Sequence, residues 1–311
     1  MCVSVQSDYY EMKVAMKLEI LLGVLSVFVA TSTSTATGSL SNNVGLSSLD
    51  MFQNSWSTYK TVVHADLMEH SSLTAKITEA IHRWIDGESS VRQSPMTDIA
   101  IADLGCGDLA LLAPLYKSLP LRVFCGVDMS LSALTLAQAA FSGSSDDSSS
   151  SSTPRTLWLN DDLLNWAKTI EVDQTADGSL STEHNQIEKF DIIVCAFSVH
   201  HLNDEDKQRY LTAIVNNKLK ARGMILMADI FRIENEERDS YIERFGSHIE
   251  KNWDVITETQ KAEVLKHVRE NDYPASLDHF ILHTAPECGL SCELIWSDTG
   301  DFEKLLVMKA L

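Results

Sequence analysis

The sequence predicts an α/β protein built on a doubly wound, mostly parallel sheet of seven strands, with an antiparallel last strand. Two observations predict this class. Short apolar runs of strand length alternate with segments of helical spacing, and several of the runs end in aspartate. Such alternation is typical of parallel strands joined by helices that cover both faces of a sheet. With 311 residues, 44% of them hydrophobic, the chain is long enough for one such domain with additions.

The first expected strand begins at Ile99 and runs through Asp103 into two glycines, Gly105 and Gly107. Glycines at this spacing allow a tight turn and a close approach of the backbone to a ligand. The segment 109–119 is expected to form a helix whose N-terminus faces that ligand. The turn therefore indicates a site for a ribose or an amino-acid moiety.

The same glycines also fit the dinucleotide pattern G-x-G-x-x-A, which Ala110 completes, with an acid about twenty residues further on. Asp103 discriminates between a dinucleotide site and the ribose or amino-acid site suggested above. In the dinucleotide turn the apolar strand end leads directly into glycine, whereas here a carboxylate precedes Gly105 by two positions. A nicotinamide-dependent oxidoreductase is the rival enzyme class, but the chain lacks a Tyr-x-x-x-Lys proton relay at a matching place.

Three further strands are expected along the first part of the chain. The second, 121–128, ends in Asp128, and Ser130 then caps a helix. The third, 157–162, also ends in acids. The fourth is expected within 190–202, a segment that ends in His200-His201-Leu202. Parallel strands that end in polar residues at one edge of a sheet are the usual place for a ligand.

The rest of the chain completes the pattern. Asn203 caps a helix that the segment 220–223 ends, and 224–229 forms the fifth strand. The segment 234–272 is expected to be a helical lid, with Tyr241, Ile242, Phe245 and Ile249 at helical spacing and a capping box at Thr257 and Gln260. A helix from Pro274 to near Gly289 and an antiparallel pair, 291–297 with 303–310, close the fold.

Taken in order, the turn Asp103-Leu-Gly-Cys-Gly107 and the segments 121–128, 157–162 and 190–202 resemble the motifs of class I S-adenosylmethionine-dependent methyltransferases. The resemblance covers roughly residues 52–311. It implies a Rossmann-like sheet, S-adenosyl-L-methionine as cofactor and a small-molecule methyl acceptor. One departure is Leu109, which stands where the family often has a third glycine. A methyltransferase-like protein that binds without catalysis is the alternative outside the enzymes, and the intact cofactor acids argue against it.

The resemblance also implies which residues hold the cofactor. Asp128 takes the ribose hydroxyls, Asp162 or, failing that, Asp161 contacts the adenine amino group, and Tyr59, on a leading helix, covers the methionine end. The full expected set is Tyr59, Asp103, Gly105, Gly107, Asp128, Met129, Asp161, Asp162 and Phe197.

Methyl transfer from a sulfonium requires alignment of the acceptor and, for oxygen or nitrogen acceptors, removal of a proton. His200 and His201 follow the fourth strand, where acceptors bind in the family, and Asp229 ends the fifth, so these three are the expected catalytic residues. Each has an alternative, structural role: one of the histidines could simply pack or bond to the backbone, and Asp229 could cap the next helix. The pairs His64/His70 and His279/His283 have helical spacing but no carboxylate or cysteine partner, so no metal is expected there.

Composition limits the partners. The net charge of −19, without a cluster of Lys and Arg, disfavours a nucleic-acid substrate. The acidic lid is expected to select a small, neutral or cationic acceptor. The six cysteines form no C-x-x-C pair and are expected to be reduced, packed thiols.

The N-terminal segment 1–48 is expected to be a targeting and linker segment outside the methyltransferase domain, which spans 49–311. Its apolar run, 16–30, is too short for a stable membrane span and is followed by small residues, a pattern that suggests secretory or organelle targeting. Without targeting, the protein is expected in the cytoplasm. Serine- and aspartate-rich pieces at 142–154 and 171–188 are expected to be surface insertions between elements.

Overall fold

The computed structural model describes residues 56–142, 154–169 and 189–311. The expected targeting segment, 1–48, and the two expected surface insertions, 142–154 and 171–188, lie outside the described residues, apart from residues 142 and 154. Within the described ranges, no helix combines the length and the apolar character needed to cross a membrane.

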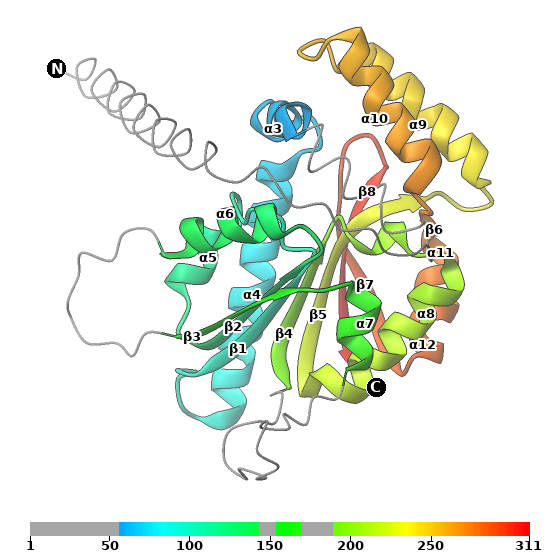
Figure 1. The fold of residues 1–311 in the computed structure, drawn as a ribbon. Helices are drawn as coiled ribbons and strands as arrows, with labels where there is room; N and C mark the ends of the chain where they lie inside the picture. The colour runs from blue at the N-terminus through cyan, green and yellow to red at the C-terminus, as the bar shows by residue number, and fades with distance from the viewer. Residues whose placement is uncertain (1–55, 143–153, 170–188) are drawn as a thin grey trace, which may run out of the picture. The chain divides into compact units, whose positions relative to one another are not determined.

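The described chain forms one mixed sheet, which confirms the predicted fold class. Its strands are β1 (Ile99–Leu104), β2 (Leu121–Asp128), β3 (Arg155–Asn160), β4 (Phe190–Ala196), β5 (Leu219–Arg232), β6 (Ala275–Ser276), β7 (Leu290–Ser297) and β8 (Glu303–Ala310). Seven of them lie in the order β3-β2-β1-β4-β5-β8-β7, and the short β6 pairs with β5 off this path (Figure 1). Strands β1 to β5 are parallel, whereas β8 is antiparallel to both of its neighbours.

Helices cover both faces of this sheet. They are α3 (Trp56–His64), α4 (His70–Arg92), α5 (Ala113–Ser118), α6 (Leu131–Ser142), α7 (Leu163–Lys168), α8 (Asp204–Ala213), α9 (Arg238–Asn252), α10 (Glu258–Asn271), α11 (Leu277–His279) and α12 (Ala285–Glu287), with short turns η1 (Val199–His201), η2 (Ile214–Lys218) and η3 (Phe280–Thr284). Alternate residues of β1 face opposite sides: Ala100 and Ala102 pack with α7 and α8, whereas Ile99 and Ile101 pack with α4 and α5. Strands buried on both faces explain the continuous apolar runs in the sequence.

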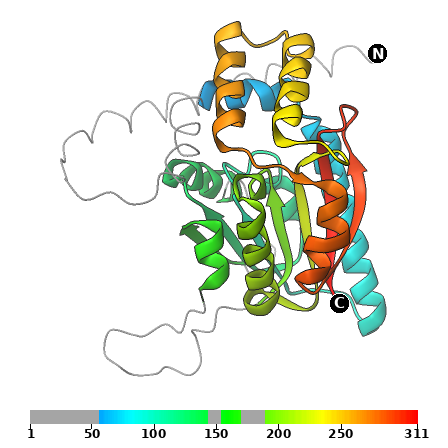
Figure 2. The same cartoon turned by 90° about the vertical axis from the view of Figure 1, so that its right-hand side faces the viewer.

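The lid, defined as α9 and α10, has an apolar core of its own. Tyr241, Ile249, Trp253 and Val264 are buried in this core, and Val62 of α3 packs into the same cluster. Both views place α3, α9 and α10 at one end of the sheet, beyond the carboxyl ends of the parallel strands (Figures 1 and 2). The capping box predicted at Thr257 and Gln260 begins α10. The predicted helical lid is therefore confirmed, and it stands where ligands of such sheets bind.

Several predicted boundaries are wrong. The helix after the glycine turn begins at Ala113, not at 109, because Leu109 has a φ of 54° and cannot continue a right-handed helix. Strand β3 ends at Asn160, two residues before the predicted end, because Asp162 is already the N-cap of α7. The segment 220–223 belongs to β5, since Leu219 already pairs with Phe190.

Two further differences concern helices. The helix expected from Pro274 begins at Leu277, after the short strand β6, and includes the π-turn η3 before Gly289 ends it with a φ of 77°. Helix α4, which has 23 residues, was not anticipated, although its buried residues Leu73, Ile77 and Ile81 have helical spacing. This helix supplies several side chains to the site described next.

Candidate active site

The glycine turn after β1 is held against the end of β2. Gly105 and Gly107 have φ values of 69° and 55°, so both occupy the left-handed region that favours glycine. The Gly107 N–H donates to Oδ2 of Asp128 (2.8 Å), and Oδ1 of Asp128 accepts from the Ser130 N–H (2.7 Å). A Cβ added at Gly107 would meet no atom within 4 Å, so the turn leaves open space on its ligand side.

Asp103 is a buried carboxylate with one unused oxygen. Its Oδ2 accepts a hydrogen bond from the Tyr116 hydroxyl (2.8 Å), whereas its Oδ1 is buried and has no hydrogen-bond partner among residues 56–142, 154–169 and 189–311. Burial, assisted by the negative charge of Asp128, raises the pKa of Asp103 to about 7, and the Tyr116 hydrogen bond only partly opposes this. An ionised Asp103 therefore needs a donor or a cation that the described residues do not provide.

A cavity of about 220 Å³ opens at this turn. It is lined by Asp103 and both glycines, and it extends to Tyr59 of α3 and to Phe197, the residue after β4. Phe197 has a φ of 53° and its ring lies 5.5 Å from that of His70. Burial is the main reason why the pKa of His70 falls to about 4, so this imidazole is neutral near pH 7.

Four members of the expected cofactor set do not line this cavity: Asp128, Met129, Asp161 and Asp162. The amide of Asn160 donates to the Met129 carbonyl (2.7 Å). Asp161 accepts from the N–H of Asp162 (2.8 Å), and the Asp162 carboxylate accepts from the N–H groups of Leu164 and Asn165 as the cap of α7. Asp128, although outside the lining, holds the turn directly through its carboxylate.

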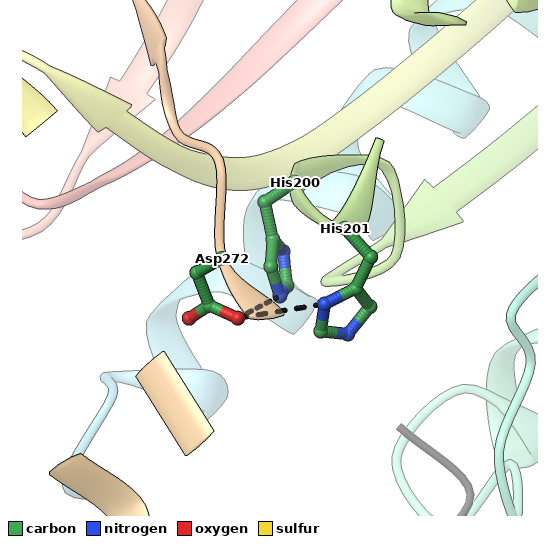
Figure 3. A group of neighbouring side chains, drawn as sticks. All are labelled: His200, His201 and Asp272. Carbon is green, nitrogen blue, oxygen red and sulfur yellow. Dashed lines mark ion pairs between the residues drawn. The ribbon is translucent and has the colours of Figure 1, made fainter. Parts of the chain in front are cut away.

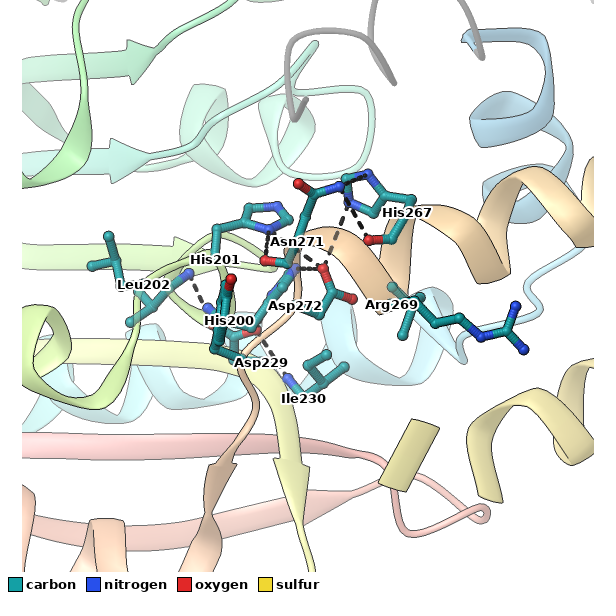
Figure 4. Close-up of polar contacts among 12 residues, drawn as sticks. His200, His201, Leu202, Asp229, Ile230, His267, Arg269, Asn271 and Asp272 are labelled. Atoms are coloured by element: carbon teal, nitrogen blue, oxygen red, sulfur yellow. Dashed lines mark hydrogen bonds and ion pairs between the residues drawn. The ribbon is translucent and has the colours of Figure 1, made fainter. Parts of the chain in front are cut away.

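At the other end of the cavity, Asp229 holds His200. The Nδ1 of His200 donates to Asp229 Oδ1 (2.5 Å), and Asp229 Oδ2 accepts from the backbone N–H groups of Val199 and His200 (both 2.9 Å) (Figure 4). Asp229 therefore caps the short turn η1 and not the next helix, which was the alternative weighed for it. In the neutral form of His200, the bond to Nδ1 fixes the tautomer, so that Nε2 carries the lone pair.

His201 and two residues of the lid complete this end of the cavity. The Tyr273 N–H donates to the His200 carbonyl (2.7 Å), which joins the end of α10 to η1. This contact brings Asp272 close to both histidines: its Oδ1 lies 3.6 Å from His200 Nε2, 3.4 Å from His201 Nδ1 and 3.6 Å from His267 Nε2 (Figures 3 and 4). His200, His201, His267 and Asp272 all line the cavity.

The charges of this group act on one another. Burial disfavours the imidazolium form of His200, but the carboxylates of Asp229 and Asp272 outweigh burial and raise its pKa above the ordinary value. For Asp272, burial is likewise outweighed by the nearby histidines, so its pKa is lowered. The pKa of His267 falls to about 4, chiefly because the side chain is buried.

The sequence analysis missed the lid's contribution of His267, Asp272 and Trp253 to the cavity. The only signal was an aspartate directly after a predicted helix, with a histidine in the last turns of that helix. Of the two lid aromatics singled out in the sequence, Phe245 lines the cavity, whereas Tyr241 is fully buried in the lid core. The pair His279/His283 lies outside the cavity lining, on exposed positions.

Comparison with known proteins agrees with this geometry. Residues 102–225 match the family model of a methyltransferase domain. No curated protein matches the chain. The plantazolicin methyltransferase BamL, solved with a triazolic desmethylPZN analogue and SAH, has a TM-score of 0.53 at 12% identity, covering 86% of this chain and 95% of that one. The magnesium protoporphyrin IX methyltransferase ChlM from Synechocystis PCC 6803, solved with SAH, has a TM-score of 0.51 at 12% identity, covering 85% and 98%. At these identities the likeness concerns the fold.

Proposed function

Since the chain carries a methyltransferase domain within the class I fold, we propose that it is an S-adenosyl-L-methionine-dependent methyltransferase with a small-molecule acceptor. One observation carries the proposal: a single cavity joins the glycine turn after β1 to the histidines after β4. In this reaction the S–CH₃ bond of the sulfonium breaks, a bond from the acceptor to CH₃ forms, and S-adenosyl-L-homocysteine and the acceptor's proton are released.

The residues at the turn fit this cofactor. The unpartnered Oδ1 of Asp103 is available to a cationic amino group, such as that of the methionine end. The open space beside Gly107 allows the ligand to approach the backbone. Asp128, whose carboxylate is anchored to the same turn, is the group for the ribose hydroxyls, and Tyr59 lines the cavity as the cover of the methionine end.

The histidine end is the acceptor end. His200 and His201 are the groups that the acceptor's nucleophilic atom would meet, and Asp229 is a positioning residue, because it fixes the His200 ring and leaves Nε2 toward the cavity. An imidazole lone pair held in this way can take the proton that an oxygen or nitrogen acceptor loses.

The lid determines which acceptor enters. Its contribution to the cavity includes the apolar side chains of Phe245, Trp253 and Val264, so the acceptor needs an apolar body of small size. The net charge of −19 disfavours a polyanion and favours a neutral or cationic molecule.

Calorimetry on the full chain tests the cofactor. We expect saturable binding of S-adenosyl-L-methionine, no comparable binding of NAD, and a loss of about ten- to hundredfold in Asp128→Ala, because a charge-assisted hydrogen bond contributes about 1.5–3 kcal/mol. Asp98→Ala is the matched control, since Asp98 is an exposed carboxylate at the opposite end of β1. Tight binding of NAD without binding of S-adenosyl-L-methionine would contradict the proposal.

A second measurement tests the acceptor class. After incubation with methyl-labelled S-adenosyl-L-methionine and a cell extract, the label should appear in the dialysable fraction. Label found only in protein or nucleic acid would overturn the small-molecule assignment.

A further inference from the structure

Three potential ligand atoms converge at the acceptor end of the cavity. His200 Nε2, His201 Nδ1 and Asp272 Oδ1 all lie within 4.8 Å of one another (Figure 3). They come from two parts of the chain, the turn η1 after β4 and the end of the lid helix α10. Two imidazoles and one carboxylate that leave the other coordination positions of the ion open form the ligand set of many sites for divalent transition metals.

The two nitrogen-to-oxygen distances fit a metal site better than a direct ion pair. Both nitrogens lie 3.4–3.6 Å from the same Asp272 oxygen, which is longer than a good N–H···O bond. Ligand atoms bound tetrahedrally at about 2.0–2.2 Å from zinc are separated by about 3.3–3.6 Å. The carboxylate oxygen is therefore spaced from each imidazole as a ligand of a shared ion would be, and the two nitrogens lie within 4.8 Å of each other.

Two further observations favour a cation at this position. Asp272 is only 4% exposed, and within the described residues its Oδ1 has only long contacts to imidazole nitrogens, at 3.4–3.6 Å, and no hydrogen bond. A bound cation stabilises a buried carboxylate oxygen better than such long contacts do. His200, in turn, donates its other ring nitrogen to Asp229, the outer carboxylate contact that orients histidines at metal sites.

One contact competes with this arrangement. His201 Nδ1 also lies 3.3 Å from the Asn271 carbonyl, a distance at the long end for a hydrogen bond. This contact does not turn the His201 ring away from the proposed site, because the same Nδ1 also faces Asp272. The partly exposed ring can therefore bind an ion without rotating.

We propose that His200, His201 and Asp272 bind one divalent transition-metal ion of the zinc or iron(II) type. Imidazole ligands favour these ions over Mg²⁺ and Ca²⁺, which prefer oxygen. The three protein ligands leave coordination positions that face the cavity, so the acceptor is of a class with an oxygen, nitrogen or sulfur donor that can reach the ion. Since the ion takes the Nε2 lone pair of His200, this imidazole is not the base in the metal-bound protein, and the ion would instead lower the pKa of the bound acceptor atom. This consequence rests on the proposed methyltransferase function, whereas metal binding itself does not.

The full chain, stripped of metal by a chelator and dialysed, tests the site with Zn²⁺ and Co²⁺. Calorimetry with Zn²⁺ should show one equivalent per chain, and Co²⁺ should give the visible absorption of a coordinated ion. His201→Ala and Asp272→Asn should each weaken Zn²⁺ binding by more than about tenfold, and Asp229→Asn by about ten- to hundredfold through loss of the outer contact. Mg²⁺ should not compete.

The control is the double variant His279→Ala/His283→Ala, which removes the exposed histidine pair of the η3 region. It should keep full Zn²⁺ binding. If this control abolishes binding, if His201→Ala does not weaken it, or if no single saturable equivalent is found, the proposal is overturned. Circular dichroism on each variant checks folding, and His201→Ala, at a partly exposed position, keeps the test valid if Asp272→Asn fails to fold. Calorimetry with S-adenosyl-L-methionine on the same samples separates failure of the metal site from failure of the proposed function.

Discussion

The two ends of the cavity differ in how the chain builds them. The cofactor end is assembled from neighbouring segments, the turn after β1 and the end of β2. They are joined by the hydrogen bond from the Gly107 N–H to Asp128 and by backbone hydrogen bonds from Gly105 and Cys106 to the Val127 carbonyl. The acceptor end is assembled from β4, β5 and the lid, and its polar group forms only when the end of α10 reaches η1 through the Tyr273 N–H. The first end depends on local backbone geometry, and the second on long-range packing.

This difference leads to a general expectation. Changes in the lid should damage the acceptor end while the cofactor end keeps most of its affinity, and changes in the glycine turn should do the reverse. The experiments below probe the lid and then the glycine turn and Asp103, in order of decreasing expected effect.

Phe245→Ala should have the largest effect. The side chain is 4% exposed and packs in the lid core, so its truncation should destabilise the lid by about 3–5 kcal/mol. Hydrogen exchange of α9 and α10 should accelerate, whereas affinity for S-adenosyl-L-methionine should fall by no more than about fivefold, the lower end of coupling between sites. Val255→Ala, at an exposed position in the connection between α9 and α10, is the control. Equal losses at both ends would show that the lid and the sheet form one cooperative unit.

Alanine substitutions at the two glycines of the turn should affect different quantities, one mainly the free energy of unfolding and the other mainly cofactor binding. A Cβ at Gly105 would lie 2.5 Å from Ser198 Cβ, and the left-handed backbone adds strain, so Gly105→Ala should cost about 2–4 kcal/mol in the free energy of unfolding. Gly107→Ala has open space and should cost only about 1–2 kcal/mol, but it should weaken cofactor binding because its methyl group enters the ligand space. Chemical denaturation and calorimetry measure the two quantities. A larger folding defect in Gly107→Ala than in Gly105→Ala would contradict this assignment.

Asp103 should make cofactor affinity depend on pH. Its pKa in the folded protein is about 7, and the cationic end of the cofactor favours the ionised form, so affinity should rise about tenfold per pH unit below 7 and level off above it. Asp103→Asn should flatten this profile, and Tyr116→Phe should move its midpoint upward, because the Tyr116 hydrogen bond lowers the pKa. A profile that is the same in wild type and Asp103→Asn would remove Asp103 from the cofactor site.

Asp103 should also make the free energy of unfolding depend on pH, and in the opposite direction to the cofactor affinity. Between about pH 4 and pH 7 the native protein keeps a proton on Asp103 that the unfolded chain has lost, so stability falls as the pH rises through this window. Denaturation curves of Asp103→Asn should show a weaker fall over the same range.

The sheet and the cofactor turn could be predicted from the sequence because their signals are contiguous. Each strand is an apolar run, and Asp103, Gly105 and Gly107 form one short motif whose chemistry follows from residue type and spacing. The boundaries were less predictable where backbone geometry overrides the pattern: Leu109 adopts a left-handed conformation and delays α5, and the cap at Asp162 shortens β3.

The polar group of the acceptor end could be predicted only in part. His200 and His201 were singled out because they follow β4, but Asp272 and His267 reach them only through the packing of the lid. No local pattern marks such a contact. The role of Asp229 was left open between a catalytic residue and a cap of the next helix, and the structure shows a third arrangement: Asp229 caps η1 and orients His200.

Helix α3 connects the two ends. Val62 packs in the lid core, and Tyr59, three residues earlier on the same helix, lines the cofactor cavity. A ligand that orders Tyr59 should therefore also favour the packing of α3 against the lid, and an acceptor that contacts the lid should favour the same packing. By thermodynamic reciprocity the proposed cofactor and acceptor should then each raise the affinity for the other by the same factor, so the two ends of the cavity should fill cooperatively and not independently.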